Sequence, residues 1–344
     1  MPEYACGGNV SWGGPMGSSD RGCARYSRRI GARIPVWTGA LAIALAPLPA
    51  TAANLPGVGD APPLVPAPST DFISQWLLMA SVSQAEQPHW IAPLVTVTPR
   101  LEQQFHADYF GQTQGNGTYI NNFGGSKGLE LITSYSTELI LGFPPFEESC
   151  PANSPCTLPP RGKDKTAEGW GDWMPFLLKY RFAAENEQNG NYIVTGFLQM
   201  SVPTGVNNIS NGLYILQPTL AFGKGWGDFD IQVTISQQYP VATINPAVNT
   251  VASFGDPVLA NIAFQYHIFE YFWPEFEVNY EYFPNGVHEH LSQVLLTPGI
   301  IFGRFPIPGG TERNNFVIGI GYQMAVTANP ITNNNLVVSA RVTF

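Results

Sequence analysis

The chain has 344 residues, of which 12% are charged and 12% are aromatic, and it contains 35 glycines and 31 prolines. The mean hydropathy is −0.02, and no run of about 18 uninterrupted apolar residues follows residue 52, which excludes a helical membrane protein. The formal net charge of −9 argues against nucleic acid as a partner, because phosphate binding requires a basic surface. Low charge with many glycines and aromatic rings favours an all-β protein.

Residues 1–52 have the order of parts found in a secretory signal peptide. Five arginines between Arg21 and Arg33 precede the apolar run GALAIALAPLPA, which ends at the small-residue site Ala50-Thr51-Ala52. This order predicts export and cleavage. The region before the apolar run is long, so the true start is either Met1 or Met16. Cleavage removes five basic and two acidic residues, which makes the mature chain more acidic than the whole.

Residues 53–88 are predicted to form a proline-rich tether followed by an amphipathic helix. The tether reads NLPGVGDAPPLVPAP (54–68) and the helix TDFISQWLLMASVSQAE (70–86). With Thr70 as the cap, Phe72, Trp76 and Ala80 recur four residues apart on one apolar face.

From residue 89 to the C-terminus, apolar and polar residues alternate as in β-strands. Phe229, Ile231, Val233 and Ile235, for example, alternate with Asp230, Gln232 and Thr234. Alternation over about ten residues between turns is typical of barrel strands with one face in lipid and the other in a polar lumen. A soluble β-sandwich also alternates, but its strands are usually about 5–6 residues long. Aromatic residues at the ends of the apolar faces, such as Tyr239 and Tyr282, further favour the membrane.

The predicted fold is all-β, a single transmembrane antiparallel up-and-down β-barrel over residues 89–344 in the bacterial outer membrane, with a short N-terminal helix. We expect about 12 strands, with 10 or 14 as alternatives. The predicted strands are 100–110, 129–143, 173–184, 191–203, 213–223, 228–239, 257–269, 274–283, 292–305, 316–328 and 334–344. Residues 89–97 are the expected twelfth strand, because single-chain bacterial barrels have even strand numbers.

The C-terminal Phe344 resembles the signal that the barrel assembly machinery recognises, and it sets the expected orientation. If Phe344 lies at the periplasmic end, residues 185–190, 224–227, 270–273 and 306–315 are periplasmic turns. The segments 144–172, 204–212, 240–256 and 284–291 are then external loops, which are expected to be longer. Residues 111–128 are long yet periplasmic in this arrangement, so either the first two strands are misplaced or this segment folds inward.

Inward-facing positions predict a polar lumen with more acids than bases. The candidate lumen and selectivity residues are Glu102, His106, Asp108, Glu130, Glu138, Lys179, Arg181, Asp228, Asp230, His267, Glu275, Glu277, Glu281 and Arg341. Unpaired carboxylates in a narrow pore favour cations, whereas pairing of Glu138 with Lys179 or Arg181 across neighbouring strands would only build the wall. Because about twelve strands leave open space inside, the 70–86 helix is a candidate plug through Phe72 and Trp76, with the periplasmic rim as its alternative position.

Two further motifs bear on chemistry. Cys150 and Cys156 in CPANSPC are predicted to form a local disulfide in an external loop, rather than a metal site, because neither His nor a third Cys lies nearby. His288, Glu289 and His290, followed by Ser292, offer weak support for a metal site or a hydrolase, since the spacing defines neither. We therefore expect no enzyme activity, no cofactor and no metal.

Several segments resemble the outer-membrane proteins associated with the phenol meta-degradation pathway. These are APLVTVTPRLEQQF (92–105), GWGDWMPFLLKYRF (169–182), SVPTG (201–205) and the terminal ARVTF. The resemblance implies a barrel that passes small, often apolar or aromatic, compounds across the outer membrane. The leading hypothesis is a passive channel for small solutes. A barrel enzyme such as a lipid hydrolase, or an adhesion or scaffold barrel, is the alternative.

The tetrapeptide GWGD occurs at 169–172 and again at 225–228. Three predicted strands separate the two copies, so they are expected at opposite ends of the barrel. There the glycines permit a turn, and Trp170 and Trp226 are placed at the membrane–water interface.

Overall fold

The computed structural model describes residues 71–125, 127–152, 167–206, 209–246, 248–311 and 313–344. The signal peptide, the tether and Cys156 lie outside the described residues, so the predictions made for them are untested. Among the described helices, none is long and apolar enough to cross a membrane.

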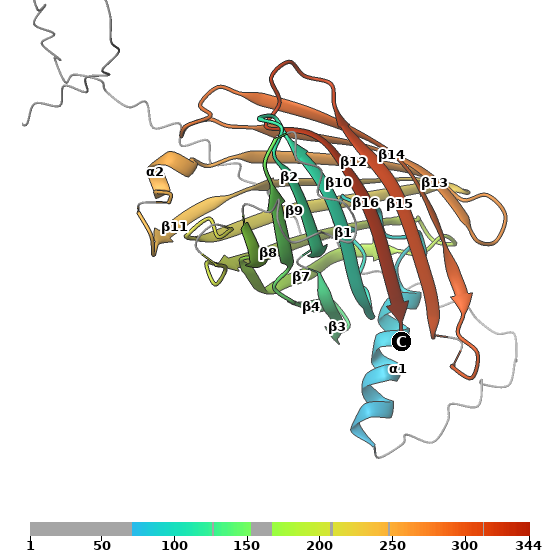
Figure 1. Ribbon diagram of the computed structural model, residues 1–344. Helices are drawn as coiled ribbons and strands as arrows, with labels where there is room; N and C mark the ends of the chain where they lie inside the picture. Colours follow the sequence, from blue (N-terminus) through green and yellow to red (C-terminus); the bar gives the residue numbers. More distant parts are fainter. Residues whose placement is uncertain (1–70, 126, 153–166, 207–208, 247, 312) are drawn as a thin grey trace, which may run out of the picture. The chain divides into compact units, whose positions relative to one another are not determined.

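The described residues form sixteen strands and two helices (Figure 1). The first elements are α1 (Phe72–Ala85), β1 (Gln104–Gln114), β2 (Tyr119–Gly124), β3 (Gly128–Ser134), β4 (Thr137–Gly142), β5 (Phe146–Cys150), β6 (Ala167–Trp170), β7 (Trp173–Glu185) and β8 (Tyr192–Val202). They are followed by β9 (Leu213–Trp226), β10 (Phe229–Gln237), β11 (Tyr239–Thr243), α2 (Val251–Phe254), β12 (Val258–Tyr266), β13 (Phe272–Tyr282), β14 (Ser292–Pro306), β15 (Asn315–Ala325) and β16 (Thr332–Thr343).

The strands close into an antiparallel barrel of 12 strands, as predicted. Four barrel strands are interrupted by short breaks, so each is described in two halves: β2 with β3, β4 with β5, β6 with β7, and β10 with β11. The first and last strands pair along their whole length, from Gln104 opposite Thr343 to Gln114 opposite Thr332, with one register shift between Thr113 and Gln114. Closure leaves no open edge along this seam, which is the condition for a sheet to cross a membrane.

The strand positions from β7 onward agree closely with the prediction, but the first three differ. Residues 129–143 are a hairpin of β3 and β4 that turns at residues 135–136, and β1 continues to Gln114 before a tight turn into β2. Residues 89–97 are not a strand at all. The unexplained long segment 111–128 is therefore the end of β1, a turn and β2, and the alternative that the first strands were misplaced is correct.

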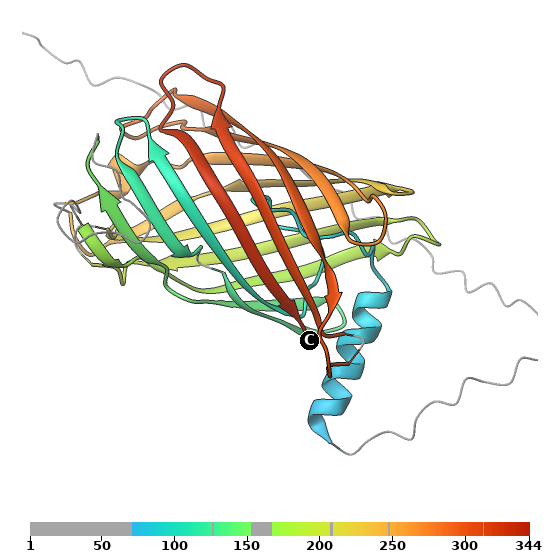
Figure 2. The same ribbon diagram turned by 45° about the vertical axis from the view of Figure 1, so that its right-hand side comes forward.

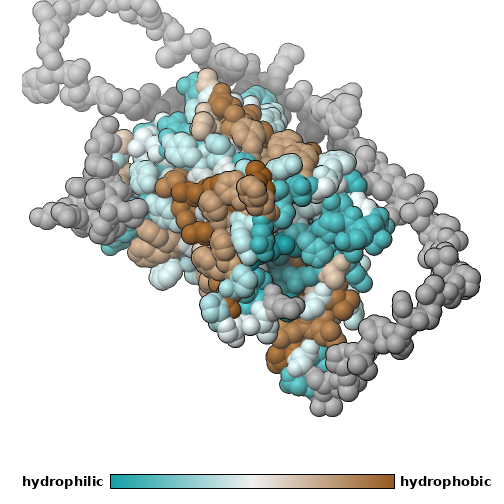
Figure 3. Space-filling view, turned by 90° about the vertical axis from the view of Figure 1, so that its right-hand side faces the viewer, coloured by the Kyte–Doolittle hydropathy of each residue, from teal (hydrophilic) through white to brown (hydrophobic). Residues whose placement is uncertain are grey.

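The outer surface of the barrel is apolar and the inner surface is polar. Along β15, Phe316, Ile318, Ile320 and Tyr322 are exposed, whereas the alternating Val317 and Gln323 are buried inside. On β7, Tyr180 and Phe182 point outward and Lys179 and Arg181 inward. In Figure 3 hydrophobic side chains form extended brown areas next to a teal hydrophilic region. A soluble protein of this size rarely exposes such a large apolar surface to water, so this surface is suited to contact with lipid.

The strand connections separate into two ends. We call the end where β16 finishes the C-terminal rim and the other the opposite rim. The C-terminal rim carries the turns 135–136, 186–191, 227–228, 267–271 and 307–314. The opposite rim carries the short turns 115–118 and 326–331 and the longer segments 203–212, 244–257 and 283–291. The two GWGD copies lie toward opposite ends of the barrel, but only the second forms a turn at a rim, where Trp226 ends β9. Trp170 lies at the break between β6 and β7, where its carbonyl accepts a hydrogen bond from the Val206 amide at 3.0 Å.

Helix α1 lies at the C-terminal rim, beside the chain end marked C (Figures 1 and 2). Asp71, rather than Thr70, caps it by accepting a hydrogen bond from the Ser74 amide at 3.0 Å. The Trp76 indole donates to the Ile132 carbonyl at 2.6 Å, and the Ser83 hydroxyl donates to the Tyr135 carbonyl at 2.9 Å. The helix is thus fixed to the β3–β4 turn.

The helix is not a plug inside the lumen. Phe72, at the start of α1, is 74% exposed, whereas Ala80 of the predicted face and Ser83, which lies on the same side of the helix, are buried. Trp76 contacts the rim and not the lumen. The rim was the alternative position considered from the sequence, and it is the one that the structure shows.

Candidate functional site

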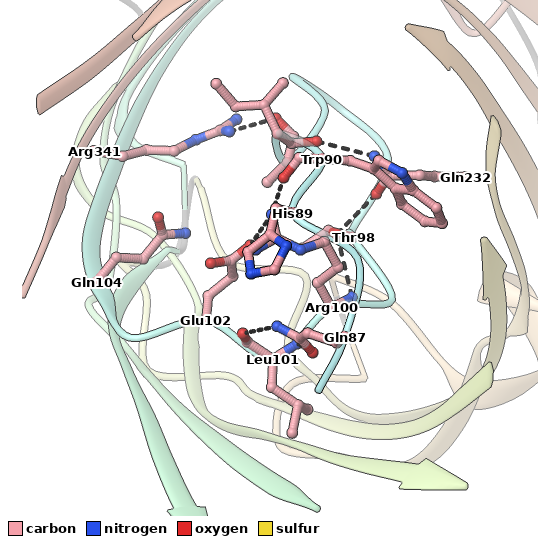
Figure 4. A network of polar contacts seen from close by, with 12 residues as sticks. Gln87, His89, Trp90, Thr98, Arg100, Leu101, Glu102, Gln104, Gln232 and Arg341 are labelled. Carbon is pink, nitrogen blue, oxygen red and sulfur yellow. Dashed lines mark hydrogen bonds and ion pairs between the residues drawn. The ribbon is translucent and has the colours of Figure 1, made fainter. Parts of the chain in front are cut away.

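The interior of the barrel is occupied by residues 87–103, which connect α1 to β1 and which we call the lumenal segment. Figure 4 shows it as an irregular chain surrounded by strands. Nearly all of its side chains are buried, although it has no helix or strand of its own. A buried segment without secondary structure must find hydrogen-bond partners for its backbone elsewhere. Here the barrel wall supplies them.

Acidic side chains of the wall accept hydrogen bonds from the backbone amides of the lumenal segment. Glu277 accepts from the Val95 and Thr96 amides, both at 2.7 Å, and from the Thr96 hydroxyl at 2.5 Å. Glu275 accepts from the Leu94 amide at 3.2 Å. On the other side of the barrel, Glu138 accepts from the Glu102 amide at 2.7 Å.

Basic side chains of the wall donate hydrogen bonds to the carbonyls of the same segment. Arg341 donates to the Ala92 carbonyl and, at 2.6 Å, to the Pro93 carbonyl. Lys179 donates to the Arg100 carbonyl at 3.0 Å and pairs with Glu138 at 3.1 Å. Hydrogen bonds to charged groups are worth about 1.5–3 kcal/mol each. The charges of the lumen therefore fasten the segment in place.

Neutral polar groups complete this set of contacts. Gln232 donates to the Ile91 carbonyl at 2.9 Å and accepts from the Thr98 hydroxyl at 2.8 Å, and the Thr195 hydroxyl donates to the Pro99 carbonyl at 2.6 Å. In Figure 4, Gln232 and Arg341 reach the segment from different parts of the wall. The segment is thus held from several directions at once.

Glycines of the wall form a socket for Leu94. A Cβ atom at Gly319 would approach the Leu94 side chain to 2.5 Å, and at Gly299 and Gly321 to 2.6 and 2.7 Å. Leu94 is 1% exposed and packs with Ile91 and Trp273. Burying such a side chain stabilises the inserted position by about 1.5–3 kcal/mol. Only residues without a side chain at these wall positions leave room for it.

A second contact of the same kind explains one GWGD copy. Trp90 of the lumenal segment lies against Gly225, where a Cβ atom would come within 2.6 Å of the indole nitrogen. Trp90 is buried, at 6% exposure. Gly225 therefore serves the packing of Trp90 in addition to the turn that follows it.

The end of the lumenal segment near α1 is held by Glu187 and Arg304. Glu187, in the turn between β7 and β8, accepts from the His89 amide at 2.5 Å and contacts its ring nitrogen Nδ1 at 2.8 Å. Burial acts to raise the pKa of Glu187, but the hydrogen bonds from His89 outweigh it and lower that pKa to about 2. Arg304 donates to the Trp90 carbonyl at 2.9 Å. A bulge in β14 between Gly303 and Phe305 redirects its side chain inward.

Most of the predicted lumen residues are indeed in the interior, but with roles other than the predicted one. Those that are buried are Glu102, His106, Asp108, Glu130, Glu138, Lys179, Arg181, Asp230, Glu275, Glu277 and Arg341. Glu102 belongs to the lumenal segment and pairs with Arg100 at 3.1 Å, and Arg181 binds the carbonyls of Ser83 and Tyr135 near α1. Pairing between Glu138 and Lys179, the alternative to free selectivity charges, is present.

Two predicted lumen residues lie elsewhere. Asp228 is exposed in the β9–β10 turn, because β10 begins one residue later than predicted. His267 lies in the β12–β13 turn at the C-terminal rim, where its ring stacks on Trp273 with centroids 4.2 Å apart. Asp228 therefore does not line the lumen, whereas His267 reaches it only through Trp273, which packs with Ile91 and Leu94.

Residues that the sequence analysis missed are the lumenal segment itself, Arg304, Gln232 and the wall glycines. Two features pointed to the segment: its alternation is weak, and Pro93 and Pro99 interrupt it. Inward-facing glycines on β14 and β15 were the other available indication, since they leave a gap that some side chain must fill.

A group resembling a catalytic triad lies in the lumen, around His106. Its Nε2 is 3.1 Å from the Ser339 hydroxyl, and its Nδ1 is 3.1 Å from Glu130. However, Asp108 also contacts Nε2, at 2.8 Å. Arg341 Nε also donates to His106 Nε2, at 3.3 Å, and to the Ser339 hydroxyl, at 3.1 Å, so Ser339 shares Nε2 with two other groups. The cavity beside His106 measures about 10 Å³, so it admits about one water.

The other candidate residues for catalysis and metal binding do not form a site. His290 contacts its own neighbour Glu289 at 3.7 Å. Among the residues that the structure describes, no group of three or more His, Cys, Asp and Glu side chains is arranged to hold a metal ion. Cys150 is buried at the end of β5, and its pairing with Cys156 remains a prediction.

At the opposite rim, the mouth of the barrel holds a cavity of about 330 Å³, which we call the vestibule. Its wall combines Glu281 and Gln293 from β13 and β14 with Phe254 of α2 and with Phe283 and His288 of the following loop. A cavity of this size and mixed polarity is in the range that small ligands occupy. The vestibule and the closed lumen together form the candidate functional site.

No family model matches this sequence, and no curated protein matches it. Among solved structures, the COG4313 outer membrane channel from Pseudomonas putida F1 is similar with a TM-score of 0.50 and 12% sequence identity, over 74% of this chain and 100% of that chain. The NanC porin is similar with a TM-score of 0.42 and 9% identity, over 70% of this chain and 98% of that chain. At such low identity the first similarity concerns the fold alone. The chain has the fold of an outer-membrane β-barrel channel.

Proposed function

We propose that the protein is an outer-membrane channel for the passive passage of small solutes, and that the lumenal segment holds it closed. The observation that carries this proposal is a closed barrel with an apolar exterior and a polar lumen, whose interior is occupied by the lumenal segment. A structural core would be filled by side chains from the wall. Here the filling is a connecting segment whose ends lie near one rim, so it can leave without unfolding the barrel.

The proposed permeants are small and hydrophobic or aromatic. The resemblance of 92–105, 169–182 and 201–205 to proteins of the phenol meta-degradation pathway supports this class. The size of the vestibule supports a small solute. The proposal places the C-terminal rim in the periplasm, with Phe344 as the contact for the barrel assembly machinery, because the longest strand connections lie at the opposite rim.

The proposal assigns no catalytic role to the chain. The cavity beside His106 admits about one water and neither a lipid nor an ester, which is the physical argument against the hydrolase alternative. A Ser339→Ala variant is expected to keep all transport properties of the wild type. Hydrolysis of a lipid or ester by the wild type that disappears in this variant would contradict this assignment.

The channel proposal is tested with the purified, refolded protein in planar bilayers and in proteoliposomes. We expect long closed periods interrupted by brief openings, and uptake of small aromatic solutes that exceeds uptake of disaccharides of larger size. Empty liposomes and heat-denatured protein are the controls. Absence of conductance and of solute uptake, both in the wild type and after removal of the lumenal segment, would refute the channel.

The socket for Leu94 gives a separate prediction about closure. A Gly319→Val substitution is expected to expel the lumenal segment, because the new side chain needs the space of Leu94. Release is measured as trypsin cleavage after Arg100, which is 4% exposed in the closed barrel. Leu94→Ala alone also favours release through lost burial, by about 2–5 kcal/mol. In the double variant, release should increase by less than the sum of the two single effects, because the alanine at position 94 leaves space for the valine at position 319. Strictly additive effects would mean that the two residues do not share this space.

A further inference from the structure

Among its described lining residues the vestibule has one acidic side chain, Glu281, and neither Lys nor Arg, while His288 is the only other titratable group. Glu281 lies on the inner face of β13 and accepts a hydrogen bond from the Gln293 amide at 2.6 Å. Gln293 in turn accepts from the amides of Ile331 and Thr332, at 3.1 and 3.2 Å. These bonds fix the orientation of Gln293, and Gln293 fixes the carboxylate of Glu281 at the cavity wall.

The remaining described walls of the vestibule are apolar or carry amides, hydroxyls and the His288 ring. Phe283 is buried beneath the cavity, and the His288 ring meets it edge-on with centroids 5.4 Å apart. Phe254 reaches the cavity from α2, a one-turn helix held by a capping box between Thr250 and Ser253. A ligand would thus find a carboxylate at one side and aromatic rings at another, both on fixed elements.

We propose that the vestibule binds small organic ammonium compounds whose apolar body carries an aromatic or alicyclic ring. This inference rests on the proposed channel function and names the class of its permeant. The ammonium group would pair with Glu281, and the ring would lie against Phe254 and Phe283. An anion is excluded by the carboxylate, because none of the described lining residues offers a positive Lys or Arg to offset it.

The row of carboxylates that begins with Glu281 in the vestibule extends along β13 into the lumen. Glu281, Asn279, Glu277 and Glu275 follow each other at every second residue of β13, so they share its inner face. Glu281 borders the vestibule, while Glu277 and Glu275 hold the lumenal segment through its amides. An ammonium group that moves along this face would meet the same carboxylates that the segment occupies. The solute and the segment therefore compete for one set of acceptors.

The test uses the full-length mature protein in detergent and three probes of nearly equal shape: phenethylamine, 2-phenylethanol and phenylacetate. Binding is measured by isothermal titration calorimetry at neutral pH and low salt. We expect phenethylamine to bind at least about tenfold more tightly than 2-phenylethanol, and phenylacetate not to bind. Equal affinity for the amine and the alcohol, or binding of phenylacetate, would overturn the proposal.

Two variants locate the site. Glu281→Gln is expected to weaken phenethylamine binding about tenfold or more, because it removes the charge while keeping the shape. Glu289→Gln is the matched control: it makes the same change on the same rim, at an exposed residue that does not line the vestibule, and should change affinity less than about twofold. If both variants weaken binding equally, the general charge of the rim attracts the amine and the assigned site is wrong.

The outcome is independent of the channel test. If the protein shows no conductance but binds the amine in a way that depends on Glu281, the binding site is supported and the channel function is refuted. Conductance and uptake that do not distinguish phenethylamine from phenylacetate, together with unchanged binding in Glu281→Gln, would retain the channel and refute the site.

Discussion

Deletion of residues 53–102 is expected to convert the protein into a permanently open channel. The deletion removes α1 and nearly all of the lumenal segment but no barrel strand, because β1 begins at Gln104 and its pairing with β16 is complete without them. A barrel of 12 strands is wider than the eight-stranded barrels that side chains alone can fill. We therefore expect single-channel conductance and solute uptake to rise by about tenfold or more.

A shorter deletion is the control for this experiment. Removal of residues 53–70 only, which leaves α1 and the lumenal segment intact, should reproduce the closed behaviour of the wild type. Folding of both variants is checked by the shift in electrophoretic mobility between unheated and heated samples. A folded 53–102 deletion that stays closed would show that other parts of the chain block the lumen, and the assigned role of the segment would be wrong.

The sequence predicts the barrel well where one face of a strand must be apolar. From β7 to β16 the outward positions are mostly apolar because they meet lipid, and the inward positions are mostly polar, apart from residues such as Trp273 and Val317 that pack against the lumenal segment. The same rule also places Lys179, Glu277 and Arg341 inside. The break at Pro144 and Pro145, by contrast, separates β4 from β5 in a way that alternation does not reveal, and the turn at residues 135–136 is too short to interrupt the pattern.

The closure of the lumen could not be predicted from alternation, for a physical reason. The lumenal segment is buried on all sides, so it has no periodic contrast between its two faces. Its partners are distant in sequence, since Val95 and Glu277 are 182 residues apart. A carboxylate that faces a pore and one that binds a backbone amide are identical in the sequence. Only the three-dimensional structure distinguishes a carboxylate that faces an open pore from one that accepts hydrogen bonds from the lumenal segment.

Replacement of Glu277 by alanine is expected to weaken closure strongly. Glu277 accepts three hydrogen bonds from Val95 and Thr96 and is 0% exposed. Its loss leaves two backbone amides unsatisfied in the closed barrel. With about 1.5–3 kcal/mol for each bond to a charged group, and partial replacement by water, we expect closure to weaken by about 3 kcal/mol. The ratio of open to closed channels should therefore rise by roughly a hundredfold.

The matched control for this prediction lies on the same strand. Glu281→Ala removes an acid from the same inner face of β13, but the hydrogen bond of Glu281 goes to Gln293 and not to the lumenal segment. It is expected to leave the open fraction and trypsin cleavage after Arg100 as in the wild type, while Glu277→Ala raises both. If the two variants open equally, negative charge in the lumen regulates the channel through its field. If only Glu277→Ala increases the open fraction, the hydrogen bonds of Glu277 to the lumenal segment hold the channel closed. Both variants remove one negative charge, but only Glu277→Ala removes these hydrogen bonds.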